Sequence, residues 1–255
     1  MNGRPADISP LQSILERLRD PASGCDWAIR QSFADIIPYT IEEAYETADA
    51  VARDDMAALK DELGDLLLQV VFHSRIAEEA GHFDLSDVID AICQKMIRRR
   101  PHILGDADQS PGWEVIKAAE RIDASEDRSA LAGVAQALPA LLRAQKLQKR
   151  AARVGFDWDN VDDVRDKLFE EIAEVADAET PDHIEEEVGD MLFAAVNLAR
   201  YHGVEPENAL RAANRKFERR FRAMEAMSGD KFADLSLDQQ EALWQAVKRD
   251  EKSSS

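Results

Sequence analysis

The segment Glu185–Phe193 reads EEEVGDMLF and places four acidic side chains beside an apolar stretch. Within it, Glu187 and Asp190 are three residues apart, and Glu171 and Glu174 show the same spacing earlier in the chain. Side chains three residues apart lie on one side of a helix, so each pair forms a row of carboxylates next to an apolar stripe. Two such helices packed as a hairpin would bring four carboxylates to one edge of the core. Half-buried carboxylates that close repel one another unless a cation neutralises them, and oxygen ligands of this kind suit Mg²⁺.

The two helices are expected to join at Thr180-Pro181, because Thr is a good N-cap and Pro fits the first helical position. Their apolar stripes have equal phase and consist of Leu168, Ile172 and Val175 in the first helix and Ile184, Val188 and Met191 in the second. Glu185 and Glu186 project away from the acid pair and are expected in solvent. Gly189 costs about 1 kcal/mol relative to Ala inside a helix. Close helix packing or room for a ligand beside the following aspartate would explain it, and the sequence leaves both open.

The same arrangement occurs earlier, where residues 61–68 read DELGDLLL. Four landmarks recur in the same order, which indicates an internal repeat. They are GCDW at 24–27 and GFDW at 155–158, EExxE at 42–46 and 170–174, ExGD at 62–65 and 187–190, and KxxRR at 95–99 and 216–220, with Val71 and Arg75 matching Val196 and Arg200. Helical spacing of apolar residues dominates and alternating strand patterns are scarce.

We therefore predict an all-α protein built from two repeated helical-bundle units. The units are expected at 1–105 and 130–228. A polar linker at 106–129 is expected between them, with a short helix around Trp113–Arg121, and a C-terminal helix and tail at 229–255.

A solvated helix face is the competing interpretation of the acidic residues. Acids make up 51 of the 255 residues, so a single ExxE pair carries little information. Two pairs in equal phase on adjacent helices, repeated in a second unit, favour a metal site instead.

The overall composition excludes several function classes. A net charge of −19 opposes binding to a phosphate backbone, so no nucleic-acid partner is expected. Cys25 and Cys93 form no CxxC pair, which favours a reducing compartment. There is no apolar run near the length of a membrane span and no leader pattern, so we expect a cytoplasmic protein without a membrane partner.

A basic segment follows the acidic hairpin. Lys216, Arg219 and Arg220 could reach a polyphosphate that metals hold on its other side, or they could form salt bridges on a surface helix. Trp158 and Trp244 could stack on a base or pack in the core. Metals and cations around a polyphosphate indicate hydrolysis of a phosphoanhydride, with a metal-activated water whose proton passes to a carboxylate.

These motifs closely resemble the MazG family of nucleoside triphosphate pyrophosphohydrolases, across nearly the whole chain. The resembling segments are LERLRDPASGCDW, IPYTIEEAYE, KDELGDLLLQVVFH and RRRPHIL in the first unit, and LPALLRAQKLQKRAARVGFDW, EEIAEVADA, EEEVGDMLFAAVNLAR and NRKFERRF in the second. The resemblance implies an all-α NTP pyrophosphatase bundle, usually a homodimer. It also implies Mg²⁺-dependent cleavage of NTPs and dNTPs to the monophosphate and pyrophosphate, with broad base tolerance. Mn²⁺ is a possible substitute for Mg²⁺, and housecleaning of the nucleotide pool is a possible role.

The resemblance also implies roles for individual residues. Metal binding and catalysis fall on Glu171, Glu174, Glu187 and Asp190. Contacts to the substrate fall on Lys167, Glu170, Asn214, Lys216, Arg219, Arg220 and Trp244.

The second unit is expected to carry the main activity. The first unit has Tyr39 where the second has Lys167, and Cys93 where the second has Asn214. We therefore expect the first acid set to be degenerate, metal-only or regulatory; it consists of Glu43, Glu46, Glu62 and Asp65.

Other readings fit less well. The EEVG at 186–189 imitates part of a Nudix box, but the first glycine and the Arg-Glu of that box are missing, as are the strands. A di-iron bundle needs ExxH motifs on its metal helices, and the only one spans Gly81 at an expected helix end. An HD phosphohydrolase would need a His-Asp dipeptide, which the chain lacks. A non-catalytic Mg-nucleotide sensor or interaction scaffold stays open as a different class, although Lys167 and the basic helix favour catalysis.

Overall fold

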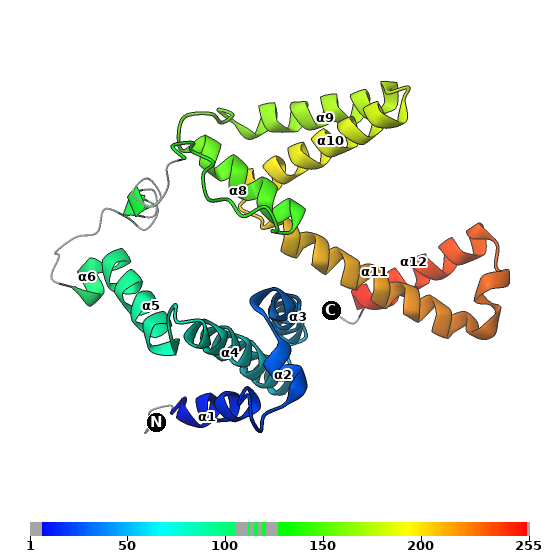
Figure 1. Ribbon diagram of the computed structural model, residues 1–255. Helices are drawn as coiled ribbons and strands as arrows, with labels where there is room; N and C mark the ends of the chain where they lie inside the picture. The colour runs from blue at the N-terminus through cyan, green and yellow to red at the C-terminus, as the bar shows by residue number, and fades with distance from the viewer. Residues whose placement is uncertain (1–6, 106–111, 113–114, 117–118, 121–126, 254–255) are drawn as a thin grey trace. The chain divides into compact units, whose positions relative to one another are not determined.

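The structure is a computed structural model that describes residues 7–105, 112, 115–116, 119–120 and 127–253. Its described residues form helices, turns and loops and include no β-strand, which confirms the all-α prediction. The chain divides into two compact units, Met1–Ala118 and Ala119–Ser255, which we call the N-terminal and the C-terminal unit (Figure 1). The short helix expected around Trp113–Arg121 falls on a stretch that lies mostly outside the described residues.

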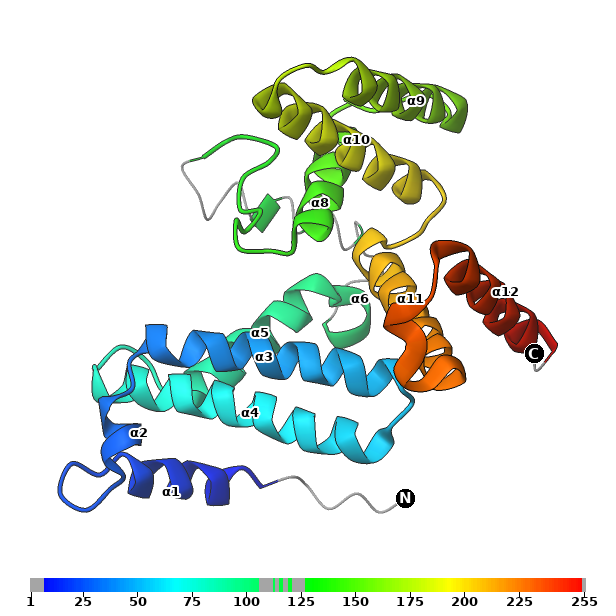
Figure 2. The ribbon, with the colours of Figure 1, turned by 90° about the vertical axis from the view of Figure 1, so that its right-hand side faces the viewer.

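The N-terminal unit is centred on a long helical hairpin. Its helices are α1 (Ser9–Leu18), α2 (Asp26–Arg30), α3 (Phe33–Ala52), α4 (Met56–Glu79), α5 (Leu85–Arg99) and α6 (Pro101–Leu104). Helices α3 and α4 lie side by side, and α1 packs against α4 (Figure 2). Ser32 caps α3 and Asp55 caps α4, so the hairpin begins and turns at side chains that satisfy free backbone N–H groups. The core between these helices includes Leu15, Ile36, Val71, Phe72 and Ile76.

The C-terminal unit repeats the hairpin and adds a second one. Its elements are α8 (Ala140–Ala152), α9 (Val161–Asp177), α10 (Pro181–Tyr201), α11 (Pro206–Ser228), a 3₁₀ helix (Gly229–Asp234) and α12 (Leu237–Ser253). Helix α9 packs along α10, α8 crosses α10, and α11 pairs with α12 (Figure 1).

The turn between α9 and α10 is the one that the sequence predicts. Thr180 is the N-cap of α10, its hydroxyl oxygen accepts a hydrogen bond from the backbone N–H of His183 at 3.3 Å, and Pro181 is the first helical residue. Asn160 caps α9 in the same way, with its side-chain oxygen 2.9 Å from the N–H of Asp162. These caps fix where each helix begins, and therefore the register in which the two acid pairs face each other.

The apolar stripes of this hairpin are only partly covered. Leu168, Val175, Val188 and Met191 are half-buried, whereas Ile172 is 46% and Ile184 is 41% exposed. The hairpin therefore keeps an uncovered apolar face. No helix among the described residues combines the length and the low polarity that crossing a membrane requires.

Candidate active site

The hairpin brings three of the four predicted acids together. Carboxylate oxygens of Glu171 on α9 and of Glu187 and Asp190 on α10 all lie within 4.8 Å of one another, and we call these residues the C-terminal acid cluster. Glu171 is only 5% exposed, which is unusual for an ionised side chain. Glu185 and Glu186 are exposed, as expected. Helical periodicity and the turn at Pro181 are sufficient to explain this convergence.

Glu174 lies beside this cluster and interacts with it. Its pKa is raised, chiefly because partial burial disfavours the charged form. Lys167 acts in the opposite direction, and the negative charges of Glu171 and Glu187 add to the rise. The carboxylates therefore repel one another, and a bound cation would relieve that repulsion.

Lys167 is the cation nearest to the cluster. Its ammonium nitrogen lies 2.6 Å from Glu170 Oε1 and 2.8 Å from Glu171 Oε1. Hydrogen bonds to Glu170 and Glu171 raise the pKa of Lys167, so the side chain stays protonated at neutral pH. A further neighbour, which the spacing of the acids did not predict, is His183, whose Nε2 lies 2.9 Å from Glu187 Oε1 one helical turn away.

The donor set fits a hard divalent cation. Three carboxylates within mutual reach supply the oxygen ligands that Mg²⁺ and Mn²⁺ prefer, and one positive side chain leaves the acids only partly neutralised. A Cβ built on Gly189 meets no described heavy atom within 4 Å. Close packing among the described residues therefore does not account for this glycine, and room for a ligand beside Asp190 stays a prediction.

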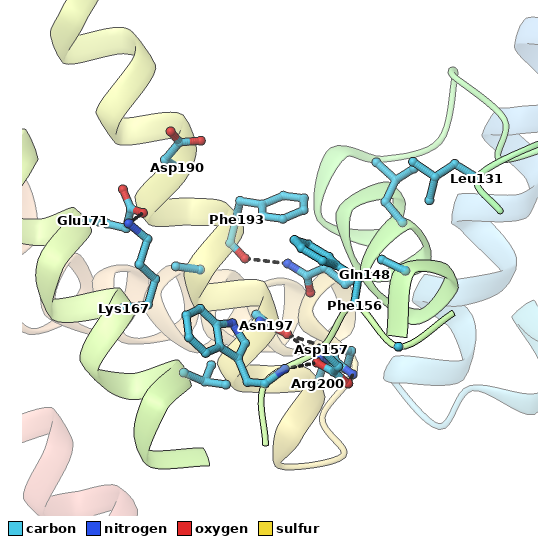
Figure 3. A pocket seen from close by; sticks show the side chains of 16 residues that line it. Leu131, Gln148, Phe156, Asp157, Lys167, Glu171, Asp190, Phe193, Asn197 and Arg200 are labelled. Carbon is cyan, nitrogen blue, oxygen red and sulfur yellow. Dashed lines mark hydrogen bonds and ion pairs between the residues drawn. The ribbon is translucent and has the colours of Figure 1, made fainter. Parts of the chain in front are cut away.

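A cavity of about 800 Å³ opens next to the acid cluster. Lys167, Glu171 and Asp190 lie at one end in Figure 3, and Phe156 and Gln148 lie at the other. The remaining lining is mostly apolar or aromatic and consists of Leu131, Leu147, Ala151, Gly155, Trp158, Val164, Phe193 and Ala194, with the polar residues Asp157, Asn197 and Arg200. A volume of this size is typical of sites for small organic ligands.

Arg200 fastens one wall of this cavity. It donates to Asp157 from Nη1 at 2.9 Å and to Asn197 Oδ1 from Nε at 2.9 Å. The hydroxyl of Tyr201 donates to the backbone carbonyl of Trp158. These bonds tie the GFDW segment to α10, and the hydrogen bonds from Arg200 lower the pKa of Asp157, so the ion pair persists at neutral pH.

The predicted basic residues form a separate cluster on the α11–α12 hairpin. Arg219 and Arg220 both bind the carboxylate of Glu251, each at 2.8 Å, and the Arg220 guanidinium lies over the ring of Trp244 at 5.4 Å. Asn214 and Lys216 are exposed on α11. Of the predicted substrate-contacting residues in the described chain, only Lys167 lines the cavity. The substrate role of all of them, Lys167 included, stays a prediction.

The N-terminal unit contains the matching acid cluster. Glu43, Glu62 and Asp65 also have oxygens within 4.8 Å of one another. The pKa of Glu62 is raised by partial burial and by Glu46, and the pKa of Glu43 is raised by partial burial and by Asp65. Repelling acids are thus a feature of both hairpins.

Comparison with known proteins agrees with the repeat. The model of the MazG nucleotide pyrophosphohydrolase domain matches residues 31–104 and again residues 160–224. The chain is 48% identical to the nucleoside triphosphate pyrophosphohydrolase of Escherichia coli K12, over 96% of this chain and 98% of that protein. It is 42% identical to the nucleoside triphosphate pyrophosphohydrolase/pyrophosphatase MazG of Thermotoga maritima, over 93% of this chain and 94% of that protein. An uncharacterised Bacillus subtilis protein, YabN, is 41% identical over 97% of this chain and 53% of its own length. The chain therefore belongs to the MazG nucleotide pyrophosphohydrolase family.

Proposed function

We propose that this protein hydrolyses nucleoside triphosphates to nucleoside monophosphates and pyrophosphate, and that the C-terminal unit carries the reaction. The observation that carries the proposal is the acid cluster with Lys167, opening into a cavity of about 800 Å³ with aromatic walls. A triphosphate requires cations, whereas a nucleoside requires an apolar slot with a few polar groups. Relatives named as nucleoside triphosphate pyrophosphohydrolases that match nearly the whole chain support the same activity.

Glu171, Glu187 and Asp190 would hold a magnesium ion, Glu174 beside them is proposed as a further ligand, and Mn²⁺ would serve as a substitute. When bound, the ion supplies Lewis-acid polarisation of phosphoryl oxygens and lowers the pKa of water.

The chain's own groups account for the remaining tasks. Lys167 is held protonated by Glu170 and Glu171, so its ammonium group can donate to a phosphate oxygen at the mouth of the cavity. Glu174 stands next to the cluster and can accept a proton from the attacking water. Trp158 and Phe156 provide flat apolar surfaces on which a base can lie, and Arg200 holds the GFDW segment in place.

The basic residues of the α11–α12 hairpin are proposed to contact the polyphosphate as well. Arg219 and Arg220 already converge on the carboxylate of Glu251, so their guanidinium groups can share one anion. Lys216 and Asn214 belong to the same hairpin and are assigned to the same task, and Trp244 on α12 is assigned to contact the base of the nucleotide.

We also propose a homodimer. Ile172 and Ile184 leave an apolar face uncovered on the α9–α10 hairpin, and Phe169, Leu192 and Phe193 are exposed on the same two helices. A second copy is a suitable occupant, because identical apolar faces are self-complementary under two-fold symmetry. Light scattering of the wild type and of Ile184→Glu would test this; a monomeric wild type would refute it.

Broad base tolerance and a cytoplasmic housecleaning role are the finer parts of the proposal. A mostly apolar cavity holds a base by stacking, which every base permits. Cys25 and Cys93 are exposed and unpaired, as suits a reducing compartment.

A panel of NTPs and dNTPs hydrolysed with Mg²⁺ in ¹⁸O-labelled water tests the whole proposal. We expect monophosphate and pyrophosphate in equal amounts, and no turnover with excess chelator. Label in the monophosphate would mean attack at the α phosphorus, and label in pyrophosphate would mean attack at β. Release of orthophosphate alone would refute a pyrophosphohydrolase. Nucleotide binding without any product would support the alternative of a Mg-nucleotide sensor.

A further inference from the structure

Gln148 is the one buried amide that lines the described cavity with an unused hydrogen-bonding atom. It lies on α8, is 7% exposed, and its Nε2 donates to the backbone carbonyl of Phe193 on α10 at 2.8 Å. Its Oε1 is buried and has no hydrogen-bond partner among the described residues. Buried polar atoms almost always bind another protein group or an ordered water, so this oxygen, on a residue that lines the cavity, is a candidate acceptor for a bound ligand.

The hydrogen bond to Phe193 determines which terminal atom of the Gln148 amide is the nitrogen and which is the oxygen. A backbone carbonyl can only accept, so the NH₂ group of Gln148 must face it. The oxygen is then held as an acceptor and cannot exchange places with the nitrogen. A ligand that satisfies Gln148 must therefore present an N–H or O–H donor.

The residues around Gln148 limit the kind of ligand that could supply this hydrogen-bond donor. Phe156 and Leu131 lie near Gln148 in Figure 3, whereas Lys167 and Glu171 lie across the cavity. A ligand that spans this space has an anionic group at one end and, at the other, a flat apolar ring with a donor on its edge. A nucleoside triphosphate has this shape.

We propose that Gln148 Oε1 accepts a hydrogen bond from an N–H on the edge of the nucleobase, which makes Gln148 a specificity-determining residue. The inference rests on the proposed function, because it assigns the base to the far end of the same cavity. One fixed acceptor can be served by the exocyclic amine of adenine, cytosine or guanine. A base without any donor on its edge would leave the oxygen unsatisfied and bind less well.

Purine riboside 5′-triphosphate provides the matching substrate, because its base is adenine without the amino group. With the wild type, we expect kcat/KM for ATP to exceed kcat/KM for purine riboside triphosphate by about tenfold, the value of one buried hydrogen bond. In Gln148→Met, which keeps the length and removes the amide, the ratio should fall to about one through loss of ATP turnover.

Gln145→Met is the matched control. Gln145 lies on the same helix, is buried, and donates from Nε2 to the carbonyl of Val204 at 3.2 Å, but it does not line the cavity. It therefore loses the same kind of helix-to-backbone bond. We expect its ATP to purine riboside ratio to match the wild type, whatever its loss of stability.

The outcomes separate cleanly. Equal turnover of the two substrates by the wild type would overturn the role of Gln148 while leaving the proposed function intact, and it needs no variant that folds. Equal losses for both substrates in Gln148→Met would show a structural role only and would also overturn it. Failure to hydrolyse either substrate would instead contradict the proposed function.

Discussion

In the N-terminal unit, Trp27 lies edge-on to Tyr39 and Phe72, with ring centroids 6.2 and 6.3 Å away. The repeat places Trp158, Lys167 and Asn197 at the corresponding positions of the C-terminal unit, and all three line its cavity. Two aromatic rings in one unit thus correspond to a cation and an amide in the other. The acids are alike in both units, so the difference lies in the space beside them.

The arginines that follow the acid clusters, Arg75 and Arg200, also have different partners in the two units. Arg75 binds Glu78 and Glu79 on its own helix, whereas Arg200 reaches Asp157 in the GFDW segment. Arg200 thereby holds a cavity wall, and Arg75 does not. A copy of the acid motif is therefore not sufficient evidence of an active site; the residues about two and three helical turns further along decide whether space remains beside the acids.

The largest expected effect comes from removing one acid from each cluster. Glu171→Gln should lower kcat/KM for ATP by about a thousandfold, because the proposed metal ligand and the partner of Lys167 are lost together. Glu43→Gln, the matched change in the N-terminal unit, should leave kcat/KM within about twofold. Steady-state hydrolysis with Mg²⁺ measures both.

The acids that neighbour the clusters provide a second matched pair for this assignment. Glu174→Ala should impair hydrolysis strongly and Glu46→Ala should not. If Glu46→Ala abolished hydrolysis while Glu174→Ala left it intact, the N-terminal unit would be the catalytic one.

The next largest effect is on stability. Phe72 is 5% exposed within the N-terminal core, so Phe72→Ala should lower the free energy of unfolding by about 3 kcal/mol through lost burial and a new cavity. Asn197→Ala removes a side chain that already faces a cavity and should cost about 1 kcal/mol or less. Denaturant unfolding followed by circular dichroism measures the two. Similar losses of unfolding free energy in the two variants would show that Phe72 is packed no more tightly in its unit than Asn197 is in the other.

Helical periodicity and the predicted turn were enough to predict three of the four acids that were expected together in each unit. Spacing fixes which side chains share a face, and the caps at Thr180 and Pro181 fix where the second helix begins. Gln148 and Leu131 could not be found in this way. Gln148 lines the cavity because α8 packs against α10, Leu131 lies in the turn that precedes α8, and no local pattern encodes either placement.

For the basic residues, the sequence predicts the kind of interaction but not the partner. Their types and order indicate anion binding, but spacing cannot say which anion each one meets. Arg219 and Arg220 meet Glu251, which lies 32 and 31 residues further along the chain, on α12. That choice depends on the turn between α11 and α12, including the positive φ of Gly229, and not on the periodicity of either helix.

An intermediate effect is expected from filling the cavity as the N-terminal unit is filled. Asn197→Phe introduces the residue found at position 72 and removes the oxygen that accepts from Arg200 at 2.9 Å. We expect kcat/KM for ATP to fall about tenfold, mostly through KM, because the base loses space while the acid cluster is unchanged. The control is Asn197→Ala, which removes the same hydrogen bond without adding volume. If both variants lost activity equally, the hydrogen bond and not the space would be responsible.

The smallest effect concerns a histidine of the N-terminal unit whose corresponding position in the C-terminal unit is not a histidine. His73 stacks on Phe33 and its Nε2 lies 3.2 Å from Thr40 Oγ1, whereas the C-terminal counterpart is Leu198. Burial lowers the pKa of His73 below the unfolded value of about 6.5. The unfolded chain therefore takes up this proton first, so the contribution of His73 to stability is present above pH 6.5 and is lost as the pH falls below it. The free energy of unfolding should decrease more between pH 7.5 and 5.5 in the wild type than in His73→Leu, while Leu198→Ala should keep the wild-type pH dependence. Parallel pH profiles for the wild type and His73→Leu would show that the imidazole is equally accessible to protons in the folded and unfolded chain.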